Sequence, residues 1–290
     1  MAVDLVAELV PQQQPAHVLQ LINGPFVMSA KGHKLDVPEG SKRLLVFVAL
    51  HSGRVERRYA AGVLWPFGDN GRASGNLRSA LWRLNRARID LIMADKYYLR
   101  IRQDVVVDVH LIFQWAARLI TGRPAHEDLR VLQTAIDALD LLPGWYDDWV
   151  LLERERLRQQ VLHGLEALSA HLAAVGRCAE AIEAAVLAVN AEPLRESAQR
   201  VLLQAHLAEG NWIEGRRGLE SYRALLRQEL DIDLSPELNR ILDSLRRPGS
   251  AVAPPQRSRT PPPRSDLPVL QSHPRQRSHT RPSAGAWQGV

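Results

Sequence analysis

The 290-residue sequence predicts a mostly α-helical protein, in which an N-terminal α+β part precedes an all-α part and a disordered tail. Alternating apolar residues after position 17 and again around 90–107 indicate short strands, and apolar residues recur at helical spacing from 108 to 245. Residues 247–290 hold nine of the eighteen prolines and almost no aliphatic residues, a composition that buries too little surface to fold. The predicted divisions are a flexible leader (1–16), an α+β domain (17–107), a helical domain (108–246) and a Pro/Arg-rich tail (247–290).

The α+β domain is expected to begin with an antiparallel sheet. The stretch "VLQLINGPFVMSAKGHKLDVP" alternates as strands do, with turns predicted at Asn23-Gly24 and at Lys31-Gly32. The next stretch, "SKRLLVFVALHSG", predicts a helix that Ser41 caps and Gly53 ends. This helix is expected to bury five apolar residues: Leu44, Leu45, Phe47, Val48 and Leu50.

Two more helices and a hairpin follow in the sequence. "RRYAAGVLWP" predicts a short helix that ends at Pro66, and Asp69 or Asn70 is placed to cap a helix over 71–88. Residues 90–107 alternate like a β-hairpin with Asp95-Lys96 at its tip. Strands, three helices and a hairpin occur in this order in the winged helix-turn-helix. In that fold the third helix enters the DNA major groove, and the hairpin, or wing, lies over the backbone or minor groove.

The third helix, "GRASGNLRSALWRLNRAR", has five arginines and no acid. One side is apolar and is expected to pack on the core: Ala73, Leu77, Ala80, Leu81 and Leu84. The opposite side carries Trp82 and the residues that we expect to contact bases, namely Arg72, Asn76, Ser79, Arg83 and Arg86. Four further basic residues are expected to contact phosphates: Arg57, Arg58, Arg78 and Lys96. By itself the helix would also fit a basic, solvent-facing helix with no partner.

Charge is segregated along the chain, which favours a nucleic-acid partner. Residues 41–102 carry thirteen Lys and Arg against four acids, whereas residues 103–246 carry fifteen Arg against twenty-three acids. A compact basic block indicates an acidic polymer, and double-stranded DNA is the partner that its predicted fold favours. The tail carries seven Arg against one Asp, which leaves two alternatives open: it adds non-specific affinity for DNA, or it is an unselected polar extension.

The helical domain contains an internal repeat. "AHLAAVGRCAEAIEAAVLAVNAEP" and "AHLAEGNWIEGRRGLESYRALLRQ" both place AHLA before a glycine, and Gly176 and Gly210 lie 34 residues apart. Gly176, Ala181 and Pro193 match a tetratricopeptide repeat, whereas the second copy has Gly215 in place of the alanine. More helices are predicted over 110–120, 127–142 and 147–175, and "LSPELNRILDSL" predicts a last helix with Ser235 as its N-cap.

Several of these stretches resemble the bacterial transcriptional activator domain regulators of the Streptomyces antibiotic regulatory protein type. The resemblance runs from about Val18 to Leu245 and rests on "LLVFVALHSGRV", "LWP", "NLRSALWRLNRAR", "LLPGWYDDWVLLERERLR", "EPLRESAQRVLLQAHLAEGN" and "SYRALLRQELDIDLSPEL". It implies an OmpR-like winged helix that binds DNA direct repeats near promoters, followed by a TPR-like helical domain that helps to recruit RNA polymerase. Binding to DNA as a homodimer stays open.

The second helix departs from the pattern of that family. It contains Gly62, it has Ala60 where a large aliphatic residue is usual, and it is preceded by Glu56 where Ser or Thr would cap it. The wing has Lys96-Tyr97-Tyr98 where a Gly-Tyr-Arg type of tip is common. An alternative function therefore stays open, in which the repeats are a protein-protein interaction scaffold and DNA binding is only non-specific.

The sequence offers no constellation for catalysis. The single Cys178 excludes an intramolecular disulfide, the His residues lack metal-ligand spacing, and no phosphate-binding glycine loop is present. The run from Glu153 to Arg156 is expected to be a solvent-facing part of a helix. We expect no enzyme, with no catalytic residue, metal site or cofactor. The N-terminal residues fit neither a signal peptide nor a membrane span, so a cytoplasmic protein is expected.

Overall fold

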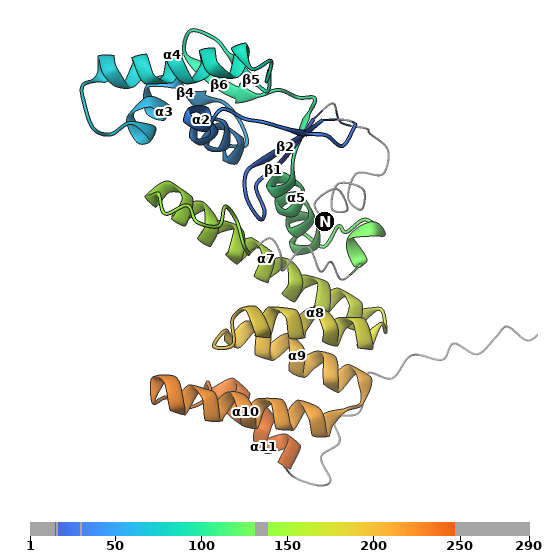
Figure 1. Ribbon diagram of the computed structural model, residues 1–290. Helices are drawn as coiled ribbons and strands as arrows, with labels where there is room; N and C mark the ends of the chain where they lie inside the picture. The colour runs from blue at the N-terminus through green and yellow to red at the C-terminus, as the bar shows by residue number, and fades with distance from the viewer. Residues whose placement is uncertain (1–14, 16, 30, 131–138, 247–290) are drawn as a thin grey trace, which may run out of the picture. The chain divides into compact units, whose positions relative to one another are not determined.

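The computed structural model describes residue 15 and residues 17–29, 31–130 and 139–246, which form an α+β region followed by helices (Figure 1). The predicted leader, apart from residue 15, and the predicted tail lie outside the described residues, as do residues 131–138 of the helix expected over 127–142. The described ends of that stretch are not α-helical: Glu127–Leu129 form a 3₁₀ turn, and Leu141 forms an isolated β-bridge with Ile22. None of the described helices is long and apolar enough to cross a membrane.

A four-stranded sheet in the order β3-β2-β1-β7 opens the α+β region. Strands β1 (His17–Gln20), β2 (Phe26–Ser29) and β3 (Lys34–Leu35) are antiparallel, and β7 (Val105–Val107) pairs with β1 in parallel. Both predicted turns are present. Asn23 (φ 63°), Gly24 (φ 117°) and Gly32 (φ 75°) take the left-handed backbone conformation that glycine and asparagine tolerate best.

Three helices and a second sheet follow, as the sequence predicts for a winged helix-turn-helix. The helices are α2 (Glu39–Leu50), α3 (Arg57–Leu64) and α4 (Asn70–Arg86), and the sheet has the order β4-β6-β5, with β4 (Val55–Glu56), β6 (Tyr98–Ile101) and β5 (Ile92–Ala94). The five apolar residues expected inside α2 are all buried. In α3, Ala60 and Ala61 are buried, and Glu56 stands at the N-cap without a side-chain hydrogen bond.

Ser41 does not cap α2, so that prediction was wrong. The helix begins two residues earlier, and the buried Ser41 hydroxyl donates a hydrogen bond to the Ala80 carbonyl of α4 at 2.9 Å. Although Ser41 has a favourable sequence position for a cap, its hydroxyl instead links α2 to α4.

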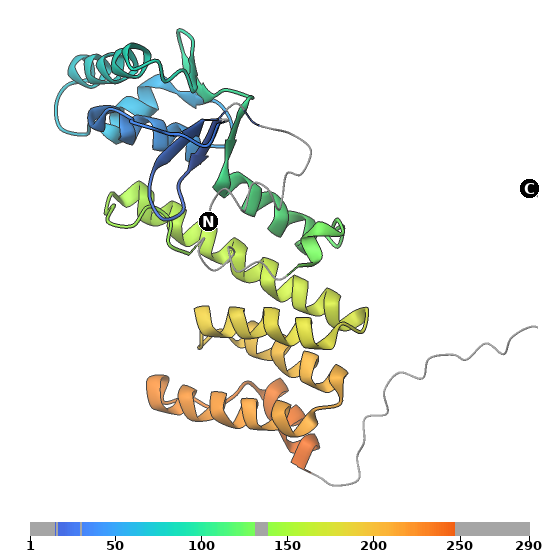
Figure 2. The ribbon, with the colours of Figure 1, turned by 45° about the vertical axis from the view of Figure 1, so that its right-hand side comes forward.

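The rest of the described chain consists of helices and the turns and loops that connect them. The helical segments are α5 (Asp108–Ile120), a 3₁₀ turn (Glu127–Leu129), α7 (Asp148–Ala174), α8 (Cys178–Ala191), α9 (Glu196–Glu209), α10 (Trp212–Leu230) and α11 (Pro236–Arg246). Helices α7, α8, α9 and α10 pack one on the next in chain order (Figure 2). Gly176 (φ 83°) and Gly210 (φ 90°) make the two repeat turns, and Ser235 Oγ accepts the Leu238 N–H at 3.3 Å at the start of α11.

The departure of the second repeat from the tetratricopeptide pattern has a packing cause. Ala181 is fully buried in α8, and Gly215 is buried at the equivalent position of α10. A Cβ atom added to Gly215 would lie 2.9 Å from Leu203 Cδ1. The larger Leu203 side chain therefore takes the volume that the alanine methyl group would need.

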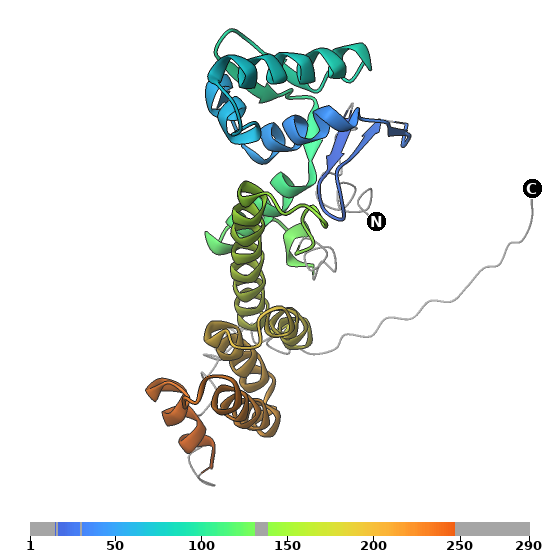
Figure 3. The same cartoon turned by 60° about the vertical axis from the view of Figure 1, so that its left-hand side comes forward.

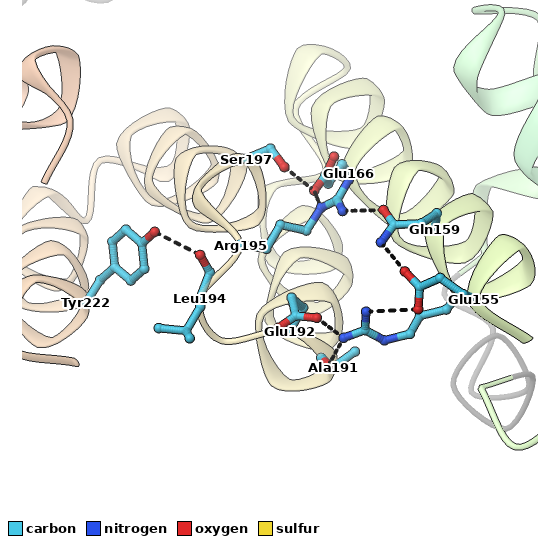
Figure 4. A network of polar contacts seen from close by, with 10 residues as sticks. Glu155, Gln159, Glu166, Ala191, Glu192, Leu194, Arg195, Ser197 and Tyr222 are labelled. Carbon is cyan, nitrogen blue, oxygen red and sulfur yellow. Dashed lines mark hydrogen bonds and ion pairs between the residues drawn. The ribbon is translucent and has the colours of Figure 1, made fainter. Parts of the chain in front are cut away.

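Polar contacts fix the first repeat on α7 (Figure 4). Arg195 Nε donates to Glu166 at 2.6 Å, and the other end of its guanidinium donates to Gln159 at 2.7 Å. Ser197 donates to the same Glu166 oxygen at 2.7 Å. The loop between α8 and α9 is thereby tied to the middle of α7.

Arg154 corrects the expectation of a fully solvent-facing run from Glu153 to Arg156. Its guanidinium is half-buried and donates to the carbonyl groups of Leu141, Leu142 and Trp145 at 3.0–3.2 Å. The arginine thus satisfies backbone acceptors of the segment that precedes α7, which a local charge pattern does not reveal.

The hydrophobic core continues across the predicted boundary at 107/108. One cluster of buried residues includes Leu19 of the first sheet, Leu45 of α2, Trp115 of α5 and Leu165 of α7. The buried Asp108 carboxylate accepts the N–H groups of Leu21, Ile22 and Val109 at 2.7–3.0 Å. The start of α5 therefore belongs structurally to both predicted domains.

Candidate nucleic-acid interface

A side-chain cap stabilises the start of helix α4, and an apolar side along its length packs on the rest of the domain. Asp69 is the N-cap, as predicted, and its carboxylate accepts the Arg72 N–H at 2.7 Å. Four of the five apolar residues expected to face inward are buried, and Leu81 is half-buried; the buried ones are Ala73, Leu77, Ala80 and Leu84. Helices α2 and α3 contact this side, so the opposite side of α4 faces outward (Figure 3).

The outward side of α4 carries most of the residues predicted to contact DNA. Arg72, Ser79, Arg86 and the flanking Arg78 are exposed, and Asn76 is half-buried at the margin. No acidic residue lies within α4. Apart from Trp82, the exposed side chains of this side are therefore cations and hydrogen-bonding groups, which suit phosphates and the edges of bases.

Arg83 is placed differently from the other candidates. Its Nη2 donates to the Gly40 carbonyl at 3.1 Å, and its Nε is buried without a hydrogen-bond partner among the described residues. The side chain thus lies against the start of α2. Together with the bond from Ser41 to Ala80, this contact fixes the angle at which α4 sits on α2.

The wing is the β5–β6 hairpin, and its tip is held by Asp95. The Asp95 carboxylate accepts the N–H groups of Tyr97 and Tyr98, each at 2.7 Å. Hydrogen bonds from the Tyr98 and Tyr97 N–H groups, with the nearby charges of Arg54 and Arg57, lower the pKa of Asp95. The carboxylate therefore stays ionised at neutral pH and keeps the turn closed.

The four predicted phosphate contacts are not equally free. Lys96 is exposed at the wing tip with Nζ 5.3 Å from the centre of the Tyr97 ring, and Arg58 and Arg78 are exposed on α3 and α4. Arg57 is half-buried, and its Nη1 donates to the Asp95 carbonyl at 3.1 Å. Arg57 thus connects the start of α3 to the wing.

A groove of about 560 Å³ lies between the second half of α4 and the wing. Two basic residues, Arg54 and Arg100, and two acidic residues, Asp90 and Asp95, line it, and the apolar parts of its wall come from α4 and β5. Arg54 was absent from the predicted contacts. Arg54 follows Gly53 directly within the basic block, and this position shows that the residue is charged but not the direction in which its side chain points.

Trp82 also stands outside the predicted contact set, although the helical spacing placed it on the outward side. Its side chain is 58% exposed, and the Arg86 guanidinium carbon lies 5.2 Å from the centre of its ring. Among the described residues no group of three or more His, Cys, Asp or Glu side chains is arranged to hold a metal ion.

Comparisons with known proteins agree with the fold and identify the helical part. The family model of the bacterial transcriptional activator domain matches residues 114–246. A solved structure of Mycobacterium tuberculosis EmbR in complex with low affinity phosphopeptide is similar with a TM-score of 0.57 and 16% identity, and the match covers 80% of this chain. The chain spans 65% of the length of that EmbR chain, and at this identity the likeness shows the fold alone. None of the curated proteins compared matches the chain.

Proposed function

Residues 114–246 belong to the bacterial transcriptional activator domain family, and from this premise we propose that the chain is a sequence-specific, DNA-binding transcriptional activator. Membership in a family of transcriptional activator domains agrees with the expectation that the chain is not an enzyme. The matched residues begin after the winged helix, so the proposal of DNA binding rests on the structure of residues 17–107.

The observation that carries the proposal is the exposed, acid-free side of α4. Its arginines stand on a helix that is capped, packed and buried on its other side, so they are presented by a rigid element. In a winged helix-turn-helix this helix enters the major groove. A helix without a partner would be expected to mix charges of both signs on its solvent side.

We assign different roles to the basic residues by their exposure and contacts. Arg72, Ser79 and Arg86 are proposed to contact base edges, with Asn76 at the margin, because guanine offers two acceptors to arginine and adenine pairs with asparagine. Arg58, Arg78 and Lys96 are proposed to contact phosphates, and we add Arg54 and Arg100 from the groove. Arg83 and Arg57, which already bind backbone carbonyls, are proposed to position α4 and the wing.

The helical half is proposed to contact the transcription machinery, including RNA polymerase. The excess of acidic residues in this half repels phosphate. Many of its arginines form ion pairs with Glu or Asp, and none of its described helices carries a row of unpaired arginines comparable with that of α4. Repeats of this kind provide a packed scaffold for protein partners. Promoter repeats would be bound by a homodimer or by separate copies.

The proposal is tested by selecting sites from a random-sequence DNA duplex library with the full-length chain. We expect an enriched sequence that the chain binds roughly 10³-fold or more above random DNA. Arg72→Ala or Arg86→Ala should lower this ratio, and the binding free energy that separates the selected site from random DNA should fall by roughly 1–3 kcal/mol per lost base contact. Arg217→Ala, which removes an exposed arginine of α10, is the matched control and should leave the ratio unchanged.

The same selection separates the proposal from the alternative scaffold function. If no sequence is enriched and binding only falls steeply with salt, DNA binding is non-specific and the chain is the interaction scaffold. If a site is enriched, transcription in vitro from a promoter carrying that site tests activation. We expect more transcript with wild type than with Arg72→Ala, and equal amounts would contradict the assignment as an activator.

A further inference from the structure

Trp82 lies in the middle of the proposed DNA-contacting side of α4. Single exposed apolar residues are common on protein surfaces, so exposure alone has no meaning. This indole, however, is 58% exposed between Ser79 and Arg86, on a side that otherwise consists of polar and cationic groups. Its neighbours are therefore the residues proposed to contact bases.

Arg86 follows Trp82 by one helical turn and stacks on its ring at 5.2 Å. A cation over an indole face is attracted by the ring quadrupole, which restricts the guanidinium before any DNA is bound. The pair thus presents a fixed cation beside a fixed apolar surface. Such a pair matches two neighbouring bases, one with paired acceptors and one with an apolar group.

The major groove contains one apolar group, the C5 methyl group of thymine, and its best partner for arginine is guanine through O6 and N7. We propose that Trp82 is a specificity-determining residue that contacts the methyl group of a thymine next to the guanine bound by Arg86. This inference rests on the proposed function, because it requires α4 to lie in the major groove.

The charge around Trp82 favours DNA over a second copy of the chain as the occupant of this surface. Arg72, Arg78 and Arg86 are exposed on or beside the same side of α4, and the helix contains no acid to pair with them. Two copies of this surface brought face to face would place like charges together without compensation. DNA supplies the negative charge that the arginines need.

The test replaces each thymine of the selected site, one at a time, by deoxyuridine. Deoxyuridine keeps the same base pairing and lacks only the C5 methyl group. Wild type should lose about 4-fold in affinity at one thymine next to a guanine, which is the effect of burying one methyl-sized apolar group. Trp82→Ala should bind the thymine and deoxyuridine sites equally, and Trp82→Phe should keep part of the difference.

Tyr146→Ala is the matched control, since it removes a 79% exposed aromatic residue that precedes α7 and should keep the full deoxyuridine effect. Three results would overturn the inference. The first is wild type that binds all deoxyuridine sites as well as thymine sites, and the second is a Trp82→Ala variant that keeps the same deoxyuridine effect. The third is a Trp82→Ala variant that loses self-association in sedimentation while its DNA binding is unchanged. If no sequence is enriched at all, the proposed function itself is wrong and this inference falls with it.

Discussion

Replacing Gly164 by alanine should test how tightly α7 holds the winged-helix half through α5. Gly164 is buried on α7, and a Cβ atom added there would lie 2.7 Å from Trp115 Cζ3 and 3.1 Å from Ala116 Cβ. The Trp115 ring is fully buried, and its Nε1 donates to the Asp128 carbonyl at 3.2 Å. Asp128 is in turn paired with Arg118 through two contacts of 2.7 Å, so the ring has little freedom to move away.

The expected magnitude follows from two opposing effects. Forcing a methyl group into a packed core costs typically about 1–3 kcal/mol, and a contact of 2.7 Å with a rigid ring belongs to the upper part of that range. Alanine recovers about 1 kcal/mol relative to glycine because it favours the helix. The free energy of unfolding should therefore fall by about 1–2 kcal/mol.

The assay is urea unfolding of the full-length chain, followed by circular dichroism and by tryptophan fluorescence. Gly218→Ala in α10 is the matched control, because nothing lies within 4 Å of the added methyl group. That variant should gain about 0.5–1 kcal/mol. A Gly164→Ala protein as stable as Gly218→Ala would refute the packing argument. In the wild type both probes should report one transition for the winged-helix half and α7, since one core cluster spans them.

Three further predictions concern charged residues. Burial raises the pKa of Asp108 to about 6, above its unfolded value of 3.8, so the stability that this group contributes is fully present below pH 3.8 and is lost as pH rises through 6. Relative to Asp108→Asn, wild type should lose about 2–3 kcal/mol between pH 4 and 7, and a pH-independent difference would contradict this. Arg195→Ala leaves the Glu166 carboxylate, only 13% exposed, without its cation and with Ser197 as a donor, and it should cost about 2–3 kcal/mol in urea unfolding. Arg217→Ala at the surface should cost under about 0.5 kcal/mol, and equal losses would contradict the role of burial. Lys96→Ala should weaken binding to all DNA sequences about equally and reduce the salt slope by about one, and a changed base preference would mean that the wing contacts bases.

The features predicted correctly from the sequence are those that local rules control. Apolar spacing located the inward side of α4, Asp69 was recognised as its cap, and the glycines at 176 and 210 were recognised as turns. Each of these depends on residues within one or two helical turns. The antiparallel strands at the N-terminus and the wing hairpin were predicted for the same reason, because alternation and turn residues lie close together in the chain. The expected hairpin over 90–107 was wrong at its end, since β7 (Val105–Val107) leaves the wing and pairs in parallel with β1, which is distant in the sequence.

The features missed are those in which a polar side chain has a distant partner. Ser41 joins α4, Arg83 binds the Gly40 carbonyl, and Arg154 binds carbonyl groups that precede α7. Helical spacing tells which direction a Cβ atom points, but a long arginine can bend back toward the protein from the margin of an exposed side. The hydrogen bond of Arg83 on which its proposed positioning role rests is therefore visible only in the three-dimensional contacts.

The continuous core bears on how the two halves divide their work. A chain ending at Val107 would lose the Asp108 carboxylate, leaving the buried N–H groups of Leu21 and Ile22 without their acceptor, and would expose the core residues that Trp115 covers. Helix α2 also contacts the start of α7. Arg43 forms an ion pair with Asp147, and the rings of Phe47 and Trp149 meet edge to face with their centres 5.2 Å apart. DNA binding and activation are therefore better separated by substitutions of exposed residues in the full-length chain than by cutting it, because loss of DNA binding in a fragment would report loss of the fold.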